Sequence, residues 1–269
     1  MIKYEYDFIK CIHRTEKAMT DEELYLQKRF KELGEKSWIS SQFFFTGFLS
    51  VSDISLLHET CDRAGIRYTL WGGAENAERQ MARFGDVESI GYEIPFPIVI
   101  LHVSPLLMKF ADEFNHRDFL GAIMNLGIKR ETVGDILVKD KEAYIFAEEK
   151  IADYIIENLD KVKHTHVKVE KIDGLPEQME TKKVERELLV SSTRLDVIVA
   201  GRYKMSRNQA LLLFRGQKIF VNGRVCENNS YQVRENDVIS VRGFGKMEFK
   251  NISGETRKGR VYVTILDYQ

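Results

Sequence analysis

The sequence contains few prolines and cysteines and no long apolar run. Four prolines in 269 residues argue against extended linkers or polyproline segments. The three cysteines, Cys11, Cys61 and Cys226, lie far apart without a CxxC pair, so a reduced cytoplasmic protein without a structural zinc is expected. No stretch approaches the roughly 18 apolar residues of a membrane span, so no membrane partner is expected. The first 17 residues are charged throughout and lack the apolar run of a signal peptide.

The apolar content is sufficient for folded domains. Hydrophobic residues make up 43% and charged residues 30% of the chain, which excludes a disordered protein. The length of 269 residues predicts two or three domains. Helical and strand-like apolar patterns alternate along the chain, so the expected fold class is α/β (α+β).

The formal net charge of −1 is distributed unevenly. Residues 181–269 hold 17 Lys and Arg against 9 Asp and Glu, a net charge of +8, whereas residues 1–180 have a net charge of −9. A basic part joined to an acidic part is typical of proteins that bind nucleic acid through the basic one. A basic face that only contacts solvent is the alternative on charge alone.

Two short helices are predicted in the basic part. Ser206 followed by Gln209 is a capping box, and Thr193 followed by Asp196 has the same spacing with aspartate in place of glutamate. Gly201 is expected to end the first helix. The N-terminus of each helix offers free backbone N–H groups, which are suited to binding phosphate.

A small sheet is predicted after these helices. The Asn222-Gly223 pair stands between β-forming residues and indicates a hairpin, because both residues tolerate positive φ. Apolar runs at 238–241 and 261–265 supply further strands. Residues 189–269 are therefore expected to form a helix-turn-helix plus small β-sheet domain, preceded by a charged linker at 174–188.

Residues 96–173 follow the order β-α-β-β-α-β. Strands are predicted at 98–103, 136–138, 143–147 and 166–169, and helices at 116–126 and 148–159. This order is ferredoxin-like and is also used by RNA recognition motifs (RRM-like). Tyr144 and Phe146 are the candidates for stacking on RNA bases, and a place in the core is the alternative for both.

Residues 1–95 are expected to form an N-terminal α/β region. Thr20 and Glu23 begin a helix, and strands at 42–45 and 67–71 flank a second helix at 53–64. A third helix is expected after Gly72-Gly73. The glycine pair is interpreted either as a tight turn or as a cradle of N–H groups for an anion.

The candidate RNA-binding residues surround the two short helices. Arg194 and Arg207 are expected in the first helical turns, where positive charge opposes the helix dipole and therefore indicates a role other than helix stability. The predicted RNA-binding site consists of Arg194, Arg202, Lys204, Ser206, Arg207, Arg215, Lys218, Asn222 and Arg224. Secondary RNA contacts are predicted for Arg79, Arg83, Arg117, Lys129 and Arg130.

The tripeptide Arg194-Leu195-Asp196 also occurs around the catalytic aspartate of pseudouridine synthases. Such an enzyme needs a large catalytic domain around that aspartate, whereas about 70 residues follow Asp196 here. A structural role at the helix start is therefore preferred. No catalytic residue, cofactor or small-molecule substrate is predicted. No metal site is predicted either, since His164 and His166 lack nearby carboxylate or cysteine partners.

The motifs resemble two known families. Arg194-Leu195-Asp196, Ser206-Arg207, 215–218 and 221–223 resemble the S-four-type RNA-binding domain, over about the last 80 residues. The stretches 46–50, 72–79 and 116–130 resemble the bacterial YlmH family, and this similarity runs through essentially the whole chain.

The YlmH resemblance implies a non-catalytic factor of ribosome-associated quality control. Such a factor engages the large ribosomal subunit with peptidyl-tRNA and supports C-terminal tailing of stalled nascent chains, so rRNA and/or tRNA are the implied partners. Two alternatives remain at this point. One is an RNA-modifying enzyme, pseudouridine-synthase-like, that uses the C-terminal domain for targeting, and the other is a scaffold whose acidic half binds a protein.

Overall fold

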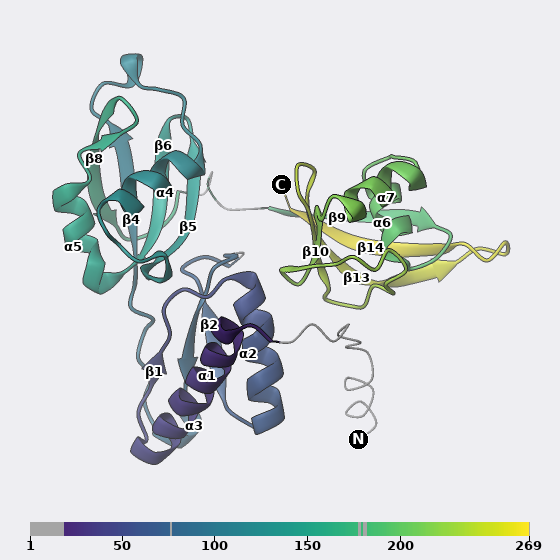
Figure 1. Ribbon diagram of the computed structural model, residues 1–269, viewed down its shortest axis with the longest axis horizontal. Helices are drawn as coiled ribbons and strands as arrows, with labels where there is room; N and C mark the ends of the chain where they lie inside the picture. The colour runs from purple at the N-terminus through teal and green to yellow at the C-terminus, as the bar shows by residue number, and fades with distance from the viewer. Residues whose placement is uncertain (1–18, 76, 177–178, 180–181, 269) are drawn as a thin grey trace.

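Three antiparallel sheets follow one another along the chain (Figure 1). This computed structural model describes residues 19–268, apart from 76, 177–178 and 180–181. Cys11 therefore lies outside the described residues. The predicted fold class, mixed helices and sheets of the α+β kind, is confirmed. None of the helices within the described part of the chain is long and apolar enough to cross a membrane.

The first sheet is small, and its strands are ordered β1-β3-β2. Its elements are α1 (Asp21–Ser40), β1 (Phe44–Phe45), α2 (Val51–Ala64), β2 (Tyr68–Trp71), β3 (Met81–Phe84) and α3 (Val87–Ile90). The predicted capping box of Thr20 and Glu23 is confirmed, and Ser50 and Asp53 form a second one. Both boxes satisfy backbone donors at the helix start, which fixes where α1 and α2 begin.

The prediction of a helix after Gly72-Gly73 is wrong, because strand β3 lies in that segment. This strand pairs with β1 on one side and β2 on the other, and all four of its residues are buried. The helix was expected from Glu75, Glu78, Arg79 and Arg83, whose spacing is close to helical, but burial in the sheet overrides this local pattern.

The second sheet has the strand order β5-β6-β4-β8-β7, with α4 and α5 on one face. Its elements are β4 (Ile98–Pro105), α4 (His116–Asn125), β5 (Val133–Lys139), β6 (Glu142–Glu148), α5 (Glu149–Asn158), β7 (Lys161–Val162) and β8 (Thr165–Ile172), with the 3-10 turns η2 (Met108–Phe110) and η3 (Arg130–Thr132). The predicted ferredoxin-like order is confirmed, with β7 as an addition. Tyr144 and Phe146 are buried, so the core interpretation holds for both.

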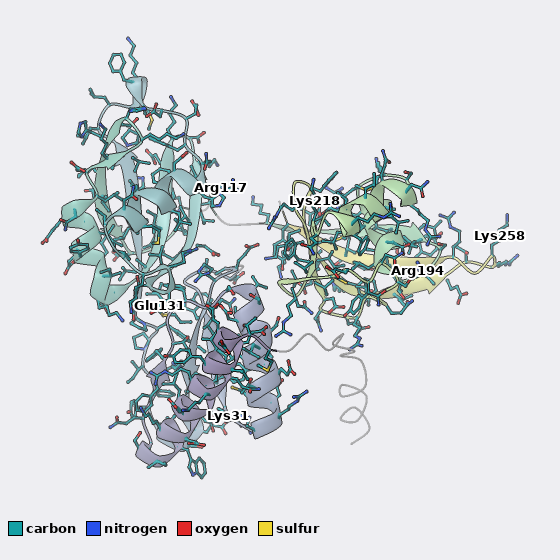
Figure 2. All side chains as sticks on the ribbon, viewed as in Figure 1. Lys31, Arg117, Glu131, Arg194, Lys218 and Lys258 are labelled. Carbon is teal, nitrogen blue, oxygen red and sulfur yellow. The ribbon has the colours of Figure 1, made fainter. Side chains whose placement is uncertain are left out.

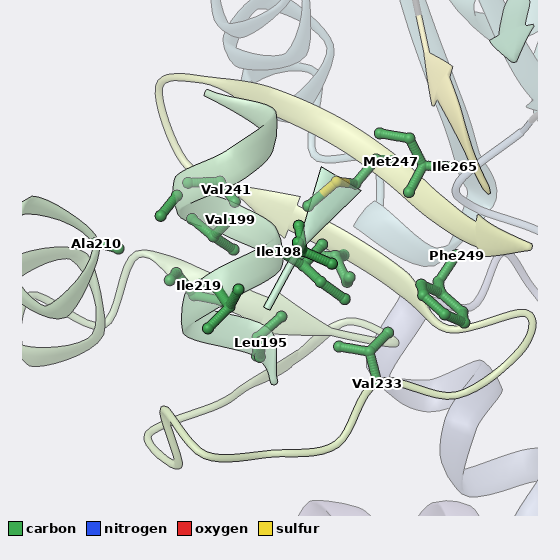
Figure 3. Packing of buried hydrophobic residues seen from close by; sticks show 14 of the residues in the cluster. Leu195, Ile198, Val199, Ala210, Ile219, Val233, Val241, Met247, Phe249 and Ile265 are labelled. Carbon is green, nitrogen blue, oxygen red and sulfur yellow. The ribbon is translucent and has the colours of Figure 1, made fainter. Parts of the chain in front are cut away.

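The third sheet has the order β11-β10-β12-β13-β14-β9. Its part of the chain comprises β9 (Lys183–Val190), α6 (Leu195–Arg202), α7 (Arg207–Arg215), β10 (Ile219–Val221), β11 (Arg224–Val225), β12 (Val238–Val241), β13 (Gly245–Glu255) and β14 (Val261–Tyr268). Figure 3 shows Leu195, Ile198 and Val199 of α6 in one apolar cluster with residues of the sheet, among them Ile219, Val241 and Ile265. The Asn222-Gly223 hairpin is confirmed, with φ of 49° and 76°.

Three details of this third part differ from the sequence predictions. The end of the predicted linker 174–188 is strand β9, which pairs with β14 along its whole length. Gly201 lies inside α6, which ends at Arg202. Arg194, and not Thr193, occupies the N-cap position of α6, and the Thr193 hydroxyl donates instead to Gln232 Oε1 at 2.9 Å.

The three sheets are joined by direct contacts. Phe48, Met81 and Phe146 form a shared apolar cluster between the first and second. The C-terminal part contacts the N-terminal part through Lys246 and through the Asn222-Gly223 hairpin. Lys246 Nζ lies 2.9 Å from Glu78 Oε1, and Ser55 Oγ donates to the Asn222 carbonyl at 2.6 Å. These contacts position α6 and α7 relative to the rest of the molecule.

Candidate nucleic-acid interface

Helices α6 and α7 present the predicted RNA-binding residues. α6 buries six consecutive residues from Leu195 to Ala200, so its packing against the sheet fixes its orientation. α7 begins with the predicted capping box, in which Gln209 N donates to Ser206 Oγ at 3.2 Å and Ser206 N to Gln209 Oε1 at 2.8 Å. Ser206 therefore orients α7 through its own side chain.

Asp196 is a buried carboxylate held between two arginines. Its side chain is 1% exposed, and both of its oxygens accept from Arg194, at 3.0 Å from Nε and 3.1 Å from Nη2. Arg207 Nη2 donates to Oδ2 of the same carboxylate at 2.8 Å. Burial by itself raises the pKa of Asp196, but the hydrogen bonds from Arg194 and Arg207 outweigh burial and lower it overall. Asp196 is therefore an ionised anchor for two guanidinium groups.

The N-terminus of α6 does not offer the free N–H groups that the sequence predicted. Leu195 N donates to the Tyr231 carbonyl at 2.8 Å, and Asp196 N donates to the Asn229 carbonyl at 3.2 Å. The start of α6 is therefore closed by the loop before β12, and an anion would have to bind through side chains. This corrects the interpretation of α6 as a helix-terminus phosphate site.

The two arginines retain donors that Asp196 does not use. Arg194 engages Asp196 with Nε and Nη2, which leaves its Nη1 group. Arg207 engages it with Nη2 alone, which leaves Nε and Nη1. The Arg194 side chain is 33% exposed and the Arg207 side chain 58% exposed. Two guanidinium groups on one carboxylate form a rigid pair with outward donors, the geometry that suits phosphate oxygens.

Arg202 and Asn222 serve internal contacts that the sequence did not reveal. Arg202 donates through Nε to Asp267 Oδ1 at 2.8 Å and also pairs through Nη2 with Oδ2. Asn222 Nδ2 donates to Asp237 Oδ1 at 2.8 Å, and its Oδ1 accepts from Val238 N at 2.9 Å. Both residues hold the fold around a buried carboxylate, so their predicted RNA contacts are secondary to these roles.

The remaining predicted residues lie at the surface. Lys204, Arg215 and Lys218 are exposed, and Arg224 is half-buried. None of these side chains has a hydrogen bond or ion pair within the described ranges. Arg242, Arg257 and Lys258 are further exposed cations that were not among the predicted residues. Arg242 follows β12, and Arg257 and Lys258 occupy the tip of the β13–β14 hairpin. The only sequence signal for them was the overall positive charge of the C-terminal part.

The secondary candidates divide into structural and exposed residues. Arg83 is buried, with Nη1 donating to the Ile94 carbonyl at 2.7 Å and its guanidinium over Phe43, so its predicted RNA contact is wrong. Arg79 and Arg130 both bond the Val133 carbonyl at the junction of the first two sheets. The junction carbonyls engage both guanidinium groups, which leaves only Arg117 and Lys129 as exposed candidates.

Arg117 and Lys129 lie at the surface of the second part. Lys129 Nζ is 4.0 Å from Glu131 Oε1, an exposed pair of small stabilising effect. Position 73 requires glycine, because its φ is +94° and a Cβ there would lie 2.3 Å from the Phe146 ring. The tight-turn interpretation of Gly72-Gly73 is therefore the one that the structure supports.

Cys61 and Asp196 are poorly disposed for catalysis. Burial raises the pKa of the Cys61 thiol to about 12, so its reactive thiolate is scarce at neutral pH. Asp196 has both oxygens on guanidinium groups and is buried, which leaves it no open path to a substrate. Among the described residues, no cluster of three or more His, Cys, Asp or Glu side chains could hold a metal ion.

Comparison with known proteins assigns a domain type to two parts of the chain. Residues 93–175 match the model described as "Putative RNA-binding domain in YlmH", and residues 193–239 match the "S4 domain". The fold and these matches define a protein with two successive RNA-binding domains. The second of them contains α6, α7 and the Asn222-Gly223 hairpin.

The chain is also similar to a curated protein along nearly its whole length. It is 29% identical over 262 residues, 96% of this chain and 97% of the other, to "Ribosome-associated protein quality control protein P2" of Bacillus subtilis (strain 168). The predicted resemblance to the YlmH family is thereby confirmed. A solved structure, "Cell division protein ylmH from Streptococcus pneumoniae", is 22% identical with a TM-score of 0.48, covering 58% of this chain and 94% of that one.

Proposed function

We propose that this protein binds rRNA or tRNA on the large ribosomal subunit and acts in the quality control of stalled nascent chains. The observation that carries the proposal is the arginine pair, Arg194 and Arg207, held on Asp196 beside the exposed cations of α7. Neutralising phosphates is the main source of affinity for structured RNA. The name of the Bacillus subtilis relative supports the ribosomal setting, which would place the protein in the cytoplasm.

We further propose a division into domains at 1–95, 96–173 and a C-terminal part that begins with β9. The predicted boundary at 189 is moved to Lys183 because β9 is an integral strand of the third sheet. The linker that was predicted at 174–188 is correspondingly shorter.

A binding role is favoured over an enzymatic one. In a pseudouridine synthase the aspartate must reach the substrate, whereas Asp196 is buried and bonded to Arg194 and Arg207. The RNA-modifying alternative predicts new modified nucleosides after incubation with ribosomal RNA. We expect none, and nucleoside analysis of the treated RNA by mass spectrometry makes the comparison.

The proposed surface is tested with variants that remove two charges each. Lys204→Ala/Arg215→Ala removes cations beside α6 and α7, and Arg257→Ala/Lys258→Ala removes two exposed cations from the β13–β14 hairpin tip, at the far end of the domain where Figure 2 labels Lys258. If the surface meets about five phosphates, log affinity falls against log salt with a slope of about −3.5 to −4.5.

The first variant is expected to reduce the steepness of that slope by about 1.4 to 1.8 and to weaken co-sedimentation with large subunits. The hairpin-tip variant has the same net charge as the first variant, but the cations that it lacks lie away from the proposed surface. It should therefore keep the wild-type slope. An equal loss of affinity in both variants would show that net charge, and not this surface, determines the affinity. A flat salt dependence of the wild type would contradict the electrostatic basis of the proposal.

A further inference from the structure

A large cavity lies where the three parts of the chain meet. Its volume is about 1170 Å³, and its walls come from all three sheets and from the segment after β8. Trp71 and Arg79 belong to the first part, Ile100 and Phe146 to the second, and Arg242 to the third. The α6–α7 surface contributes none of these residues, so the cavity is a separate site.

The inner wall of the cavity is apolar and aromatic. Ile100, Leu137 and Phe146 line it from one side. Trp71, which is 40% exposed, and the half-buried Phe220 add aromatic surface. Exposed or half-exposed aromatic rings beside an apolar wall are the surfaces on which unpaired bases stack.

The charged residues that line the cavity are four carboxylates, of Glu75, Glu78, Asp135 and Asp173, and four cations, of Arg79, Arg130, Arg242 and Lys246. Asp135 accepts from Glu78 N at 2.6 Å and from Arg79 N at 3.1 Å, and burial raises its pKa although both hydrogen bonds lower it. Glu75 and Glu78 also line the wall. Carboxylates at the wall repel phosphates but accept hydrogen bonds from the amino groups of bases.

Among the cations of the described lining, Arg79 and Arg130 donate to backbone carbonyls and Lys246 pairs with Glu78, so Arg242 is the one that is exposed. Arg242 is exposed, its guanidinium lies 5.2 Å from the centre of the Phe220 ring, and its backbone N donates to the Lys218 carbonyl at 2.8 Å. Arg117 is exposed and follows His116, which lines the cavity. In Figure 2, Arg117 and Lys218 stand on the sides of their domains that face each other. Arg242 and Arg117 are therefore the exposed cations that phosphates would meet beside the cavity.

We propose that this cavity binds a single-stranded RNA segment, with bases against Trp71 and phosphates at Arg117 and Arg242. Aromatic rings for base stacking, carboxylates for the amino groups of bases and exposed guanidinium groups for phosphates are the partners that an unpaired strand requires. The site deepens the proposed function by naming unpaired RNA as a second ligand class, but it does not depend on the α6–α7 surface.

The two tryptophans of the chain provide a direct test. Trp71 lines the cavity, whereas Trp38 lies on α1 with 83% exposure and is not among the lining residues. In the full-length Trp38→Phe variant, only Trp71 reports. We expect a single-stranded RNA hexanucleotide of mixed sequence to quench its fluorescence with saturation. In Trp71→Phe, where only Trp38 reports, we expect no saturable change.

Affinity for the hexanucleotide is then measured with charge-matched variants. Arg117→Ala/Arg242→Ala is expected to reduce the steepness of the salt dependence by about 1.4, the value for two phosphate contacts on a single strand. Arg257→Ala/Lys258→Ala removes the same charge from the distant hairpin tip and should bind as the wild type does. Trp71→Ala should weaken binding by roughly 5- to 150-fold through lost stacking, whereas Trp38→Ala should not.

Each outcome decides the proposal separately from the general function. If Trp71 is not quenched while structured RNA still binds through α7, the cavity assignment is wrong and the proposed function stands. Equal loss in both double variants would reduce the cavity to nonspecific charge attraction and would overturn the site. A Trp71 response to an unstructured uncharged peptide, without one to RNA, would assign the cavity to polypeptide and also overturn it.

Discussion

At the scale of single residues, buried carboxylates organise the basic C-terminal domain. Asp196 holds Arg194 and Arg207, and Asp267 in the same way holds Arg202 and Arg186, the latter at 3.0 Å. A buried carboxylate is costly unless it is paired, so each aspartate requires its arginines as much as it orients them. The positive charges at the helix starts are therefore explained first by Asp196, and the RNA contacts proposed for them come in addition to that role.

Asp196→Asn distinguishes two roles of Asp196, its negative charge and its alignment of Arg194 and Arg207, because the two predict opposite changes in RNA affinity. Removal of a negative charge near phosphates should by Coulomb attraction strengthen binding. We expect weaker binding, by roughly ten-fold, because Arg194 and Arg207 lose the anchor that aligns their donors. Fluorescence titration with a fragment of ribosomal RNA measures the change.

Asp267→Asn is the matched control for this experiment. It removes the same charge from another buried arginine-bound carboxylate, on β14. We expect both variants to lower the unfolding temperature, but only Asp196→Asn to weaken RNA binding. Stronger binding by Asp196→Asn would show that Asp196 only offsets charge and does not position the arginines.

The lowered pKa of Asp196 predicts an acid-dependent contribution to stability. Its folded pKa lies below the unfolded value of about 3.9, so the stabilisation is complete above that pH and is lost as pH falls through the folded pKa. The difference in unfolding temperature between wild type and Asp196→Asn should be constant at neutral pH. It should shrink as the pH is lowered below about 4. A difference that is the same at all pH values would mean that the carboxylate stays equally paired in the unfolded chain.

At the scale of helices and strands, local signals predicted what local chemistry determines. The capping boxes at Thr20 and Ser206 and the Asn222-Gly223 hairpin depend on neighbouring residues, and all three are present. The ferredoxin-like order was also recognisable, because short apolar runs typical of strands alternate with longer amphipathic segments typical of helices.

The missed elements depend on distant partners. β9 is rich in charged and exposed residues, so its sequence resembles a linker, and only its pairing with β14 makes it a strand. The same holds for the site, where the pairing of Arg202 with Asp267 joins residues 65 positions apart. Arg83 was predicted as a surface cation because its charge is visible in the sequence, whereas the burial of β3 depends on its neighbours in the sheet. Sequence periodicity carries no information about such contacts.

The role of β9 gives a prediction about the C-terminal domain in isolation. A fragment of residues 183–269 should fold cooperatively, whereas one of residues 189–269 exposes the edge of β14 and loses the packing of Leu188. Thermal unfolding followed by circular dichroism compares them. We expect a sharp transition for the longer fragment and a broad one, or aggregation, for the shorter. Identical transitions would return the domain boundary to 189.

At the scale of the whole molecule, the hairpin of the C-terminal domain also contacts the N-terminal part. The Asn222 carbonyl accepts from Ser55 Oγ, and Lys246 pairs with Glu78. Gly223 fits against α2 so closely that a Cβ would lie 2.6 Å from backbone and side-chain atoms of Val51. The three contacts hold the wall that carries Arg242 against the wall that carries Trp71, so the cavity depends on this docking.

Gly223→Ala should therefore separate the C-terminal domain from α2. Gly259→Ala is its control, because Gly259 also lies in a hairpin with a similar φ, +74° against +76°, but has no neighbour within 4 Å of a Cβ. Both variants carry the same backbone strain, so their unfolding temperatures should fall by similar amounts. Only Gly223→Ala should increase the radius of gyration in small-angle X-ray scattering and weaken hexanucleotide quenching of Trp71. If the two variants scatter alike and bind alike, the docking of the hairpin does not shape the cavity, and the RNA site would have to be formed by the first two parts of the chain alone.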